Sequence, residues 1–426
     1  MLNQMKELKR EKRWRFPYSA ILLLLILNGL FISCSYDLPD DHLELSQADE
    51  LIETAIRERL IPGAVLLVGT SDSILYHKAS GHAAIYDRDG TPLPESVEMS
   101  TSTLFDIASL TKIFATTYGI KLLHSRGLIG LDDPVSIYLP ELDTDELRSI
   151  TVRQLLSHTS GLPQWYPTFY RSNDKQERLQ LIPGLATIGP AGGQRRYSDL
   201  GFMILADLIE VISSEPFEYF LDRNLYDPLQ LNSTFFNPDI SQVHSIAATS
   251  HGNPFEKRMV YDDNFGYTID IDPESWNGWR DYVLIGEVND GNAYYTHQGV
   301  AGHAGLFSTA EELYRLTALF FNDGMHNNTR IFDKDSIDLF LQPDSFGHGL
   351  GYMMDSRSLH ANELPEGSFG HTGFTGTNFI VIPDRDLIII LLTNRQHFGV
   401  DEETSYPDLR KLRSDIADLF LSIQPE

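Results

Sequence analysis

Cysteine is almost absent from this chain, and several other site-forming patterns are missing with it. Cys34 is the only cysteine among 426 residues, so no disulfide can form within the chain. The 14 histidines include no H-E-x-x-H motif and no paired ligand spacing, and there is no glycine-rich phosphate loop. We therefore expect no metal and no other cofactor. The absence of a G-x-S-x-G motif argues against an α/β-hydrolase.

Positive charge is also scarce. Sixty acidic residues outweigh 33 lysines and arginines, which gives a formal net charge of -27. This balance argues against a nucleic-acid partner, because phosphate backbones are bound by basic surfaces. The apolar run at 18–32 is short for a membrane-spanning helix, which needs about 20 residues.

The N-terminal segment has the features of an export signal. A basic stretch precedes the apolar run, and small residues follow it at Ser33 and Cys34. The sequence Phe-Ile-Ser-Cys at 31–34 resembles a bacterial lipobox, although Phe31 departs from the usual leucine. The resemblance implies a signal peptide over 1–33 and lipidation of Cys34. The alternatives are a plain signal peptide or an uncleaved anchor with an incidental cysteine.

Localisation follows from that segment. Residues 34–46 are short, acidic and proline-containing, and we expect them to form a lipidated tether. The predicted protein is exported and held as a membrane-anchored lipoprotein in the bacterial cell envelope.

Apolar patterns predict β-strands near both ends of the chain. Residues 63–69 and 74–79 form one hairpin, and 377–382 and 387–393 form another around a Pro-Asp-Arg-Asp turn. With 42% hydrophobic residues, the chain can bury a large core around such a sheet.

Helical patterns flank these strands, at 47–59 and 409–423. We predict an α+β fold in which an antiparallel sheet of the five-stranded type is flanked by N- and C-terminal helices. The domain spans 47–423, and a mainly helical region at about 109–360 is inserted between its strands. Within that region, 254–295 is rich in Asp, Asn, Gly and Trp and is assigned only to loops.

Ser109 and Lys112 are the first candidates for chemistry. Apolar positions after Ser109 predict a buried helix beginning near it, and residues three apart share one helix face. Burial and the positive helix N-terminus both lower the pKa of Lys112, so the neutral amine can accept the serine proton. Alternatively, Ser109 is a simple N-cap and Lys112 a solvated charge.

Two further motifs are ambiguous alone. Tyr197 and Asp199 lie in a polar cluster before an apolar helix, where a loop can present a phenol and a carboxylate. His371, Thr372 and Gly373 precede the C-terminal hairpin and offer donors at a strand edge. A capping residue and a turn are the structural alternatives.

The order of the three motifs is more specific than any one of them. S-x-x-K, Y-x-[ND] and [KH]-T-G in this order resemble the penicillin-recognising serine hydrolases, which include class C β-lactamases, DD-peptidases and related esterases. The stretches 105–108, 130–140, 151–162 and 302–309 are also similar to this family. The likeness covers roughly 45–423 and implies a β-lactamase/transpeptidase-like fold.

The resemblance implies a role for each matching residue. Ser109 attacks a carbonyl, while Lys112 and Tyr197 share the general-base and general-acid work. The backbone N–H groups of Ser109 and Phe374 form the oxyanion hole. Substrate is bound by four residues: Asp199, His371, Thr372 and Gly373. Within the stretch 302–309, we interpret His303 as a structural histidine.

Two residues depart from the β-lactamase pattern. His371 replaces a lysine and looks more like some DD-carboxypeptidases and esterases; with an ordinary pKa of about 6.5, its binding of a carboxylate would weaken as pH rises. Asp199 replaces the usual asparagine, which disfavours β-lactam hydrolysis and tends to raise the pKa of Lys112. We therefore expect Asp199 to have a partner of its own.

The predicted function is a serine hydrolase that forms an acyl-enzyme at Ser109. A D-alanyl-D-alanine carboxypeptidase-like activity on cell-wall peptides is favoured by His371 and the export signal, with family analogy as the warrant. An esterase or a β-lactamase of the same family remains open, as does a non-catalytic protein that binds penicillin or cell-wall ligands. Expected partners are a small-molecule or peptide substrate and, through the lipid anchor, a membrane.

Overall fold

The computed structural model describes residues 41–241, 245–267 and 269–423, and it divides the chain at residue 41 into a short N-terminal unit and a large unit, His42–Glu426. The signal peptide over 1–33 and Cys34 lie outside the described residues, so they stay predictions. No helix in the described ranges is both long enough and apolar enough to cross a membrane.

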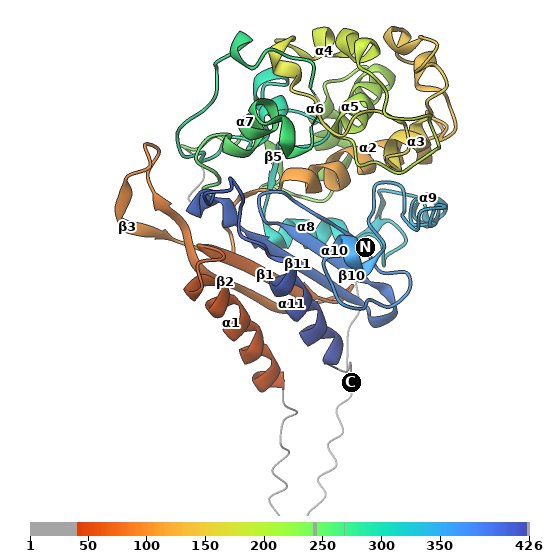
Figure 1. The fold of residues 1–426 in the computed structure, drawn as a ribbon. Coiled ribbons are helices and arrows are strands. Elements are labelled where there is room, and N and C mark those ends of the chain that lie inside the picture. Colours follow the sequence, from red (N-terminus) through yellow and green to blue (C-terminus); the bar gives the residue numbers. More distant parts are fainter. Residues whose placement is uncertain (1–40, 242–244, 268, 424–426) are drawn as a thin grey trace, which may run out of the picture. The chain divides into compact units, whose positions relative to one another are not determined.

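An antiparallel sheet built from both ends of the chain forms the base of the large unit (Figure 1). Its strand order is β3-β2-β1-β11-β10-β9. The strands are β1 Gly63–Gly69, β2 Ile74–Tyr86, β3 Pro92–Glu98, β9 Phe369–Thr372, β10 Asn378–Ile382 and β11 Leu387–Thr393. The central pair is β1 with β11, in a register that runs from Ala64 opposite Thr393 to Gly69 opposite Ile388. The predicted α+β class and the joining of the two hairpins are confirmed.

The described sheet has six strands, whereas a five-stranded type was expected. The difference lies in β2, which continues past the predicted end at residue 79 as far as Tyr86. The extra length pairs with β3, from His82 opposite Glu98 to Tyr86 opposite Pro92, with irregular register. Most β3 side chains are exposed, so this strand lacked the apolar pattern on which the prediction relied.

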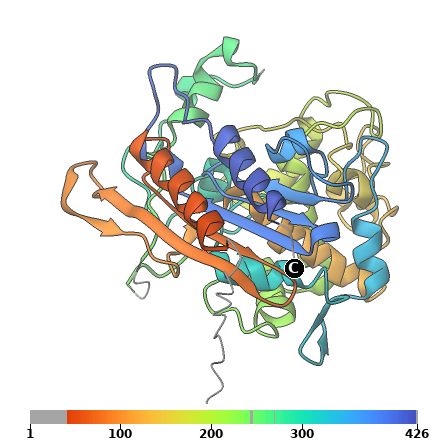
Figure 2. The same cartoon turned by 90° about the horizontal axis from the view of Figure 1, so that it is seen from below.

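Side chains on successive residues of a strand point to opposite faces, and both faces of this sheet are covered. On one face Leu66, Ile389 and Leu391 pack with α1 (Asp41–Arg57) and α11 (Arg410–Ser422), the helices seen side by side in Figure 2. On the other face Val65 and Ile390 belong to the larger core, which includes the helices of the inserted region. Burial on both faces explains why these strands read as continuous apolar runs.

Helix α1 begins earlier than the sequence suggested. Residues 41–46 were expected to belong to the tether, but the helix starts at Asp41. Their polar composition was equally compatible with the first turns of an exposed helix.

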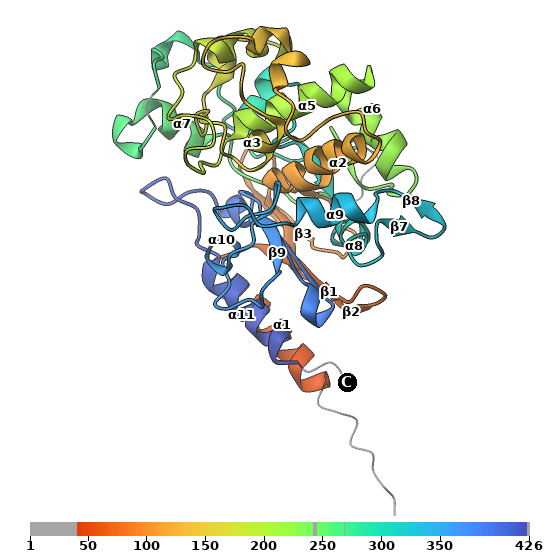
Figure 3. The same ribbon diagram turned by 90° about the vertical axis from the view of Figure 1, so that its right-hand side faces the viewer.

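Between β3 and β9 the described chain contributes no strand to the main sheet and is mostly helical (Figure 3). Its helices are α2 Tyr118–Ser125, α3 Val152–Leu156, α4 Lys175–Leu181, α5 Asp199–Ser213, α6 Phe217–Leu221, α7 Pro254–Tyr261, α8 Ala310–Ala318, α9 Lys334–Phe340 and α10 Ser356–Leu359. Short strands also occur: β4 Phe105–Asp106, β5 Phe235–Phe236, β6 Leu306–Ser308, β7 Met325–His326 and β8 Thr329–Arg330. The assignment of 254–295 entirely to loops was wrong, because α7 lies within it.

Strand β9 forms one edge of the main sheet, and part of that edge is occupied. The N–H and C=O of Gly370 exchange hydrogen bonds with Met353, at 2.9 and 3.0 Å. Because outward-facing groups alternate along an antiparallel strand, Thr372 is the next residue whose backbone faces away from β10.

Candidate active site

Ser109 lies in a short 3-10 turn, Ala108–Leu110, that leads through a π-helical turn at Lys112–Thr117 into α2. A helix near Ser109 was expected, but regular α-helix begins only at Tyr118. Ala108, just before the nucleophile, has a φ of 48°, a left-handed conformation that is costly for a residue other than glycine.

The buried side chain of Asp106 holds this strained turn in place. One carboxylate oxygen accepts from Ala108 N (2.8 Å) and the other from Asn289 N (2.7 Å). Burial raises the pKa of Asp106 to about 6, so at neutral pH the carboxylate can accept both bonds. The segment before Ser109 is thereby joined to the chain around Asn289.

Lys112 is fully buried beneath Ser109, and its ammonium has three acceptors. Its Nζ lies 3.0 Å from Ser109 Oγ, 3.0 Å from the carbonyl oxygen of His303 and 2.8 Å from Asp199 Oδ1. An ammonium has three N–H groups, so these contacts use all of them.

The charge state of Lys112 differs from the sequence-based expectation. Burial lowers its pKa, but the negative charge of Asp199, together with the interaction with Tyr197, more than offsets this, and the pKa is raised above its ordinary value. The prediction of a neutral amine at rest was therefore wrong. A separate partner was expected for Asp199, but among the described residues its ion-pair partner is Lys112 itself.

Tyr197 is brought to Ser109 and Lys112 as predicted. Its ring centroid lies 4.8 Å from Lys112 Nζ, and its phenol interacts with the side chains of both Ser109 and Lys112. Burial raises the pKa of Tyr197, against the opposing charge of Lys112. Ser109, Lys112 and Tyr197 are thus close together, so Lys112 and Tyr197 can titrate as a pair.

His158 positions Tyr197 from behind. Its ring centroid lies 4.4 Å from that of Tyr197, and its Nδ1 accepts from the backbone N–H of Ser198 (3.0 Å). Ser198 is in turn the N-cap of α5, with its hydroxyl donating to Pro163 O (2.7 Å). His158 lies in the stretch 151–162, but its role could not be predicted, since nothing in the local sequence indicates its distant partner.

His371 lies on β9 and is 1% exposed. Its Nδ1 donates to Thr372 O (2.8 Å), while its Nε2 has no partner among the described residues. Burial lowers the pKa of His371 to about 3, with the charge of Lys112 acting in the same direction. The side chain is therefore neutral at working pH, and the expected loss of carboxylate binding above about pH 6.5 is wrong.

The turn after β9 brings Phe374 to the site. Gly373 N donates to Thr377 O (2.7 Å), and a Cβ at Gly373 would lie 2.0 Å from Thr377 Oγ1, so only glycine fits. Thr377 Oγ1 also donates to Ile107 O (3.0 Å), which ties the turn to the chain before Ser109. Among the described residues the Phe374 N–H has no acceptor, so it and the Ser109 N–H are available to an oxyanion.

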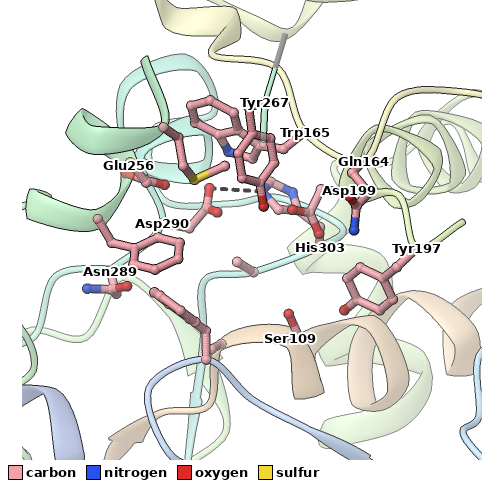
Figure 4. A pocket seen from close by; sticks show the side chains of 15 residues that line it. Ser109, Gln164, Trp165, Tyr197, Asp199, Glu256, Tyr267, Asn289, Asp290 and His303 are labelled. Atoms are coloured by element: carbon pink, nitrogen blue, oxygen red, sulfur yellow. Dashed lines mark hydrogen bonds and ion pairs between the residues drawn. The ribbon is translucent and has the colours of Figure 1, made fainter. Parts of the chain in front are cut away.

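A cavity of about 290 Å³ opens above Ser109 (Figure 4). Of the predicted residues, Ser109, Tyr197, Asp199 and Phe374 line it, whereas Lys112 lies beneath. The triplet 371–373 is not part of the lining.

Several lining residues were missed by the sequence analysis, because they come from 254–295, which shows no clear periodicity. They include Glu256, Asn289 and Asp290. His303, interpreted as structural, also lines the cavity and is paired with Asp290 through its Nε2 (2.8 Å). Its backbone is close to α5, where a Cβ at Gly302 would meet Phe202 O at 2.1 Å.

Across the described ranges, no group of three or more His, Cys, Asp or Glu side chains is arranged to hold a metal ion.

Comparison with known proteins agrees with this geometry. The family model described as Beta-lactamase matches residues 48–412. The N-acetylmuramyl-L-alanine amidase of Bacillus subtilis (strain 168) is 31% identical, over 92% of this chain and 93% of its own length. A protein of Escherichia coli (strain K12) with the provisional name D-alanyl-D-alanine carboxypeptidase is 28% identical, over 82% of each chain.

A solved structure shows the same fold. The class C β-lactamase from Rhodobacter sphaeroides superposes with a TM-score of 0.63 at 19% identity, covering 88% of this chain and 98% of its own. Since the family model spans most of the chain, including Ser109, Lys112, Tyr197 and the turn at Gly373, the protein belongs to the β-lactamase family and is a serine hydrolase.

Proposed function

We propose that this serine hydrolase cleaves an amide bond in cell-wall peptides, with the D-alanyl-D-alanine bond as the first candidate. The observation that supports this most is the placement of Ser109 between Lys112 and Tyr197 at the floor of an open cavity. The names of the relatives from B. subtilis and E. coli also describe cell-wall amide hydrolases.

The proposed reaction proceeds through an acyl-enzyme. Ser109 Oγ attacks the carbonyl carbon as its proton passes to the Lys112–Tyr197 pair, and the N–H groups of Ser109 and Phe374 stabilise the oxyanion. Collapse breaks the C–N bond, and the amine leaves with the proton. Water then hydrolyses the ester. Because Lys112 is protonated at rest, the pair must first lose a proton to solvent before it can act as a base.

A second candidate is the amide between a muramyl lactyl group and L-alanine, the bond in the name of the B. subtilis relative. No lysine or arginine is among the cavity-lining residues, and His371 is neutral, so a leaving group with a free carboxylate finds no cation on the wall. A muramyl amide does not need one. Esterase activity stays a third possibility, whereas the Asp199–Lys112 pair disfavours β-lactam turnover.

The nucleophile is tested by intact-protein mass after treatment with a fluorophosphonate and, separately, with penicillin. We expect one adduct that is absent in Ser109→Ala and retained in the exposed control Ser102→Ala. A persistent penicilloyl adduct supports the peptidase assignment, and fluorophosphonate labelling alone supports an esterase. No adduct from either reagent would replace the enzyme with a ligand-binding protein.

The bond is tested with purified muropeptides analysed by mass spectrometry. Loss of one alanine from a pentapeptide stem supports the carboxypeptidase assignment. Separation of the whole peptide from the muramyl sugar supports the amidase.

We also propose that the protein is exported and anchored by lipid at Cys34. The motif at 31–34 is the support for this. Cells grown with a radiolabelled fatty acid should label the wild-type protein in the membrane fraction, and Cys34→Ala should remove the label. An unlabelled wild-type protein that retains residues 1–33 would contradict the proposal.

A further inference from the structure

The chemistry of the cavity wall indicates what kind of ligand fits beside Ser109. Three carboxyl groups line it, on Asp199, Glu256 and Asp290, and none of the lining side chains is a lysine or arginine. Because the cavity adjoins the nucleophile, we take it as the substrate-binding cavity. The charges and hydrogen-bonding groups of its wall then indicate which chemical groups the substrate carries.

Positive charge near these carboxyl groups is limited. Lys112 is paired with Asp199, and its other two N–H groups are used by Ser109 and His303. Arg280 lies behind Glu256, but its guanidinium donates to the carbonyl oxygens of Val288 and Asn289 and to Asn253.

Glu256 shows the effect of this shortage. It is 8% exposed and accepts hydrogen bonds from Gly291 N (2.8 Å) and Asn253 Nδ2 (2.8 Å). Burial, followed by the negative charge of Asp290, raises the pKa of Glu256 to about 8. Without a cationic ligand this carboxyl group is therefore protonated near neutral pH, and a bound ammonium would lower its pKa and favour the carboxylate.

Other polar atoms of the wall are also acceptors. His303 is 1% exposed, its Nε2 lies 2.8 Å from Asp290 Oδ1, and its buried Nδ1 has no partner among the described residues. Asn289 donates its amide group to Ser250 Oγ (2.6 Å), which leaves its Oδ1 as the remaining side-chain atom. A ligand with N–H donors can therefore pair with the carboxyl oxygens of this wall.

Aromatic rings complete the wall. Trp165 and Tyr267 lie edge to face, with centroids 6.0 Å apart, and Phe255 lies 5.0 Å from Phe374. The faces of such rings attract cations, particularly where water is scarce. Acceptors and π-faces in one cavity both favour an organic ammonium over a carboxylate.

The position of the acidic groups relative to Tyr197 indicates which part of the substrate carries the charge. Figure 4 shows Glu256 and Asn289 across the cavity from Tyr197, with Ser109 between them. In the proposed reaction the leaving nitrogen takes its proton from the Lys112–Tyr197 pair and so lies on that side. The acyl part then extends toward Glu256.

We propose that the cavity recognises substrates whose acyl part carries a protonated amine, held by Glu256 and Asp290 and covered by the aromatic wall. This inference rests on the proposed acyl-enzyme function and specifies its substrate class. Amino-bearing stem peptides fit it better than acyl groups that are neutral or anionic.

The test compares three D-alanine p-nitroanilides that differ only at the α-nitrogen: free amine, N-acetyl and N-succinyl. Binding to the Ser109→Ala protein is measured by calorimetry at about pH 6.5, below the α-amino pKa of about 7.7. We expect the free amine to bind about tenfold or more tightly than the acetyl compound, and the succinyl compound to bind worst.

Substitution of Glu256→Gln in the same background should reduce the preference for the amine about tenfold, while the exposed control Glu274→Gln should keep it. Equal or tighter binding of the acetyl or succinyl compound would overturn the inference.

Turnover of the same compounds by the wild-type protein separates this inference from the proposed function. If the amine binds preferentially but is not turned over, the specificity for an ammonium group is supported and the proposed hydrolysis is contradicted. If the compounds are turned over without a preference for the amine, the hydrolysis is supported and the specificity is contradicted. The binding stoichiometry in each calorimetric titration counts folded sites, so that a misfolded protein is not read as a loss of preference.

Discussion

Asp199 decides the protonation state of Lys112, because its carboxylate lies 2.8 Å from the ammonium in a buried site. A raised pKa means that the basic form of the pair is lost as pH falls, so activity should increase with pH into the alkaline range. We expect Asp199→Asn to lower the pKa of Lys112 and to move the rising limb of kcat/KM about 1–3 pH units lower. The measurement is a pH profile with a chromogenic ester.

Asp263→Asn, at an exposed position, is the matched control and should leave the rising limb of the kcat/KM pH profile unchanged. The same Asp199→Asn variant restores the asparagine of the β-lactamase pattern, so its acylation by penicillin should become faster. A limb that does not move would show that Asp199 does not set the charge of Lys112.

Lys121 is a second fully buried lysine, with no carboxylate beside it. Its Nζ donates to Tyr352 OH (3.2 Å) and lies 4.6–5.3 Å from the centroids of five rings. The rings are those of Tyr118, Phe320, Phe332, Phe340 and Tyr352. Burial lowers its pKa to about 7, so ring contacts compensate only part of the lost hydration.

Replacement of Lys121 by methionine should therefore stabilise the protein. Between about pH 7 and the unfolded pKa of about 10.4, the unfolded chain binds one more proton than the native one, so wild-type stability rises with pH. Lys121→Met removes this dependence. We expect its free energy of unfolding to exceed the wild-type value by about 4 kcal/mol at pH 7, with the gain disappearing by about pH 10.5.

Urea denaturation at several pH values measures this difference. The exposed residue Lys257→Met is a matched control for the change of side chain, and should show no such trend. A Lys121→Met protein that is less stable than wild type at pH 7 would mean that the ring contacts outweigh the desolvation.

At this scale the sequence predicted which residues meet but not what charge they hold. Ser109, Lys112 and Tyr197 come together as their motif order indicated. The charge of Lys112 depends on its 2.8 Å distance to Asp199, and the charge of His371 depends on its burial. Neither the distance nor the burial can be predicted from a short sequence motif.

The turn between β9 and β10 makes a prediction at the level of an element. A methyl group at Gly373 would meet Thr377 Oγ1 at 2.0 Å and Ile107 O at 2.7 Å, so Gly373→Ala must displace the turn that presents Phe374 N–H. Because loss of one oxyanion donor typically costs about 10²–10³ in kcat, we expect a decrease of that size with a smaller change in KM.

Gly184→Ala is the control, because no atom lies within 4 Å of the Cβ it adds. It should retain wild-type kcat in the same assay. If Gly373→Ala retained full kcat, the assignment of Phe374 to the oxyanion hole would be wrong.

Elements whose apolar residues form a continuous run or a regular spacing were predicted from the sequence, and elements without such a pattern were not. The buried strands β1 and β11 read as unbroken apolar runs, and α11 as an amphipathic helix. Strand β3 is largely exposed, and α7 begins at Asn253-Pro254 inside a polar segment, so neither shows a clear apolar period.

For the whole molecule, the pairing of β1 with β11 joins the two ends of the chain. A fragment of residues 47–360 lacks β9, β10, β11 and α11, and exposes both the edge of β1 and the face that packs against α11. Each buried Leu or Ile side chain that becomes exposed costs about 1.5–3 kcal/mol, so a handful outweigh a typical stability of 5–15 kcal/mol.

We therefore expect this fragment to be unfolded or aggregated when produced alone. Circular dichroism and size-exclusion chromatography are the measurements, and co-expression with residues 361–426 should restore soluble protein. A fragment that unfolds cooperatively alone would show that the helical region is independently stable.

The edge of β9 sets a limit on what can lie beside the nucleophile. Met353 already occupies both backbone groups of Gly370, so the next outward position along that edge is Thr372, whose carbonyl oxygen also accepts from His371 Nδ1. A peptide that docks there by strand addition can form a single rung before it meets Met353. The edge of β9 can therefore bind the end of a short peptide chain. It excludes the middle of a long one, because the segment at Met353 occupies the next position.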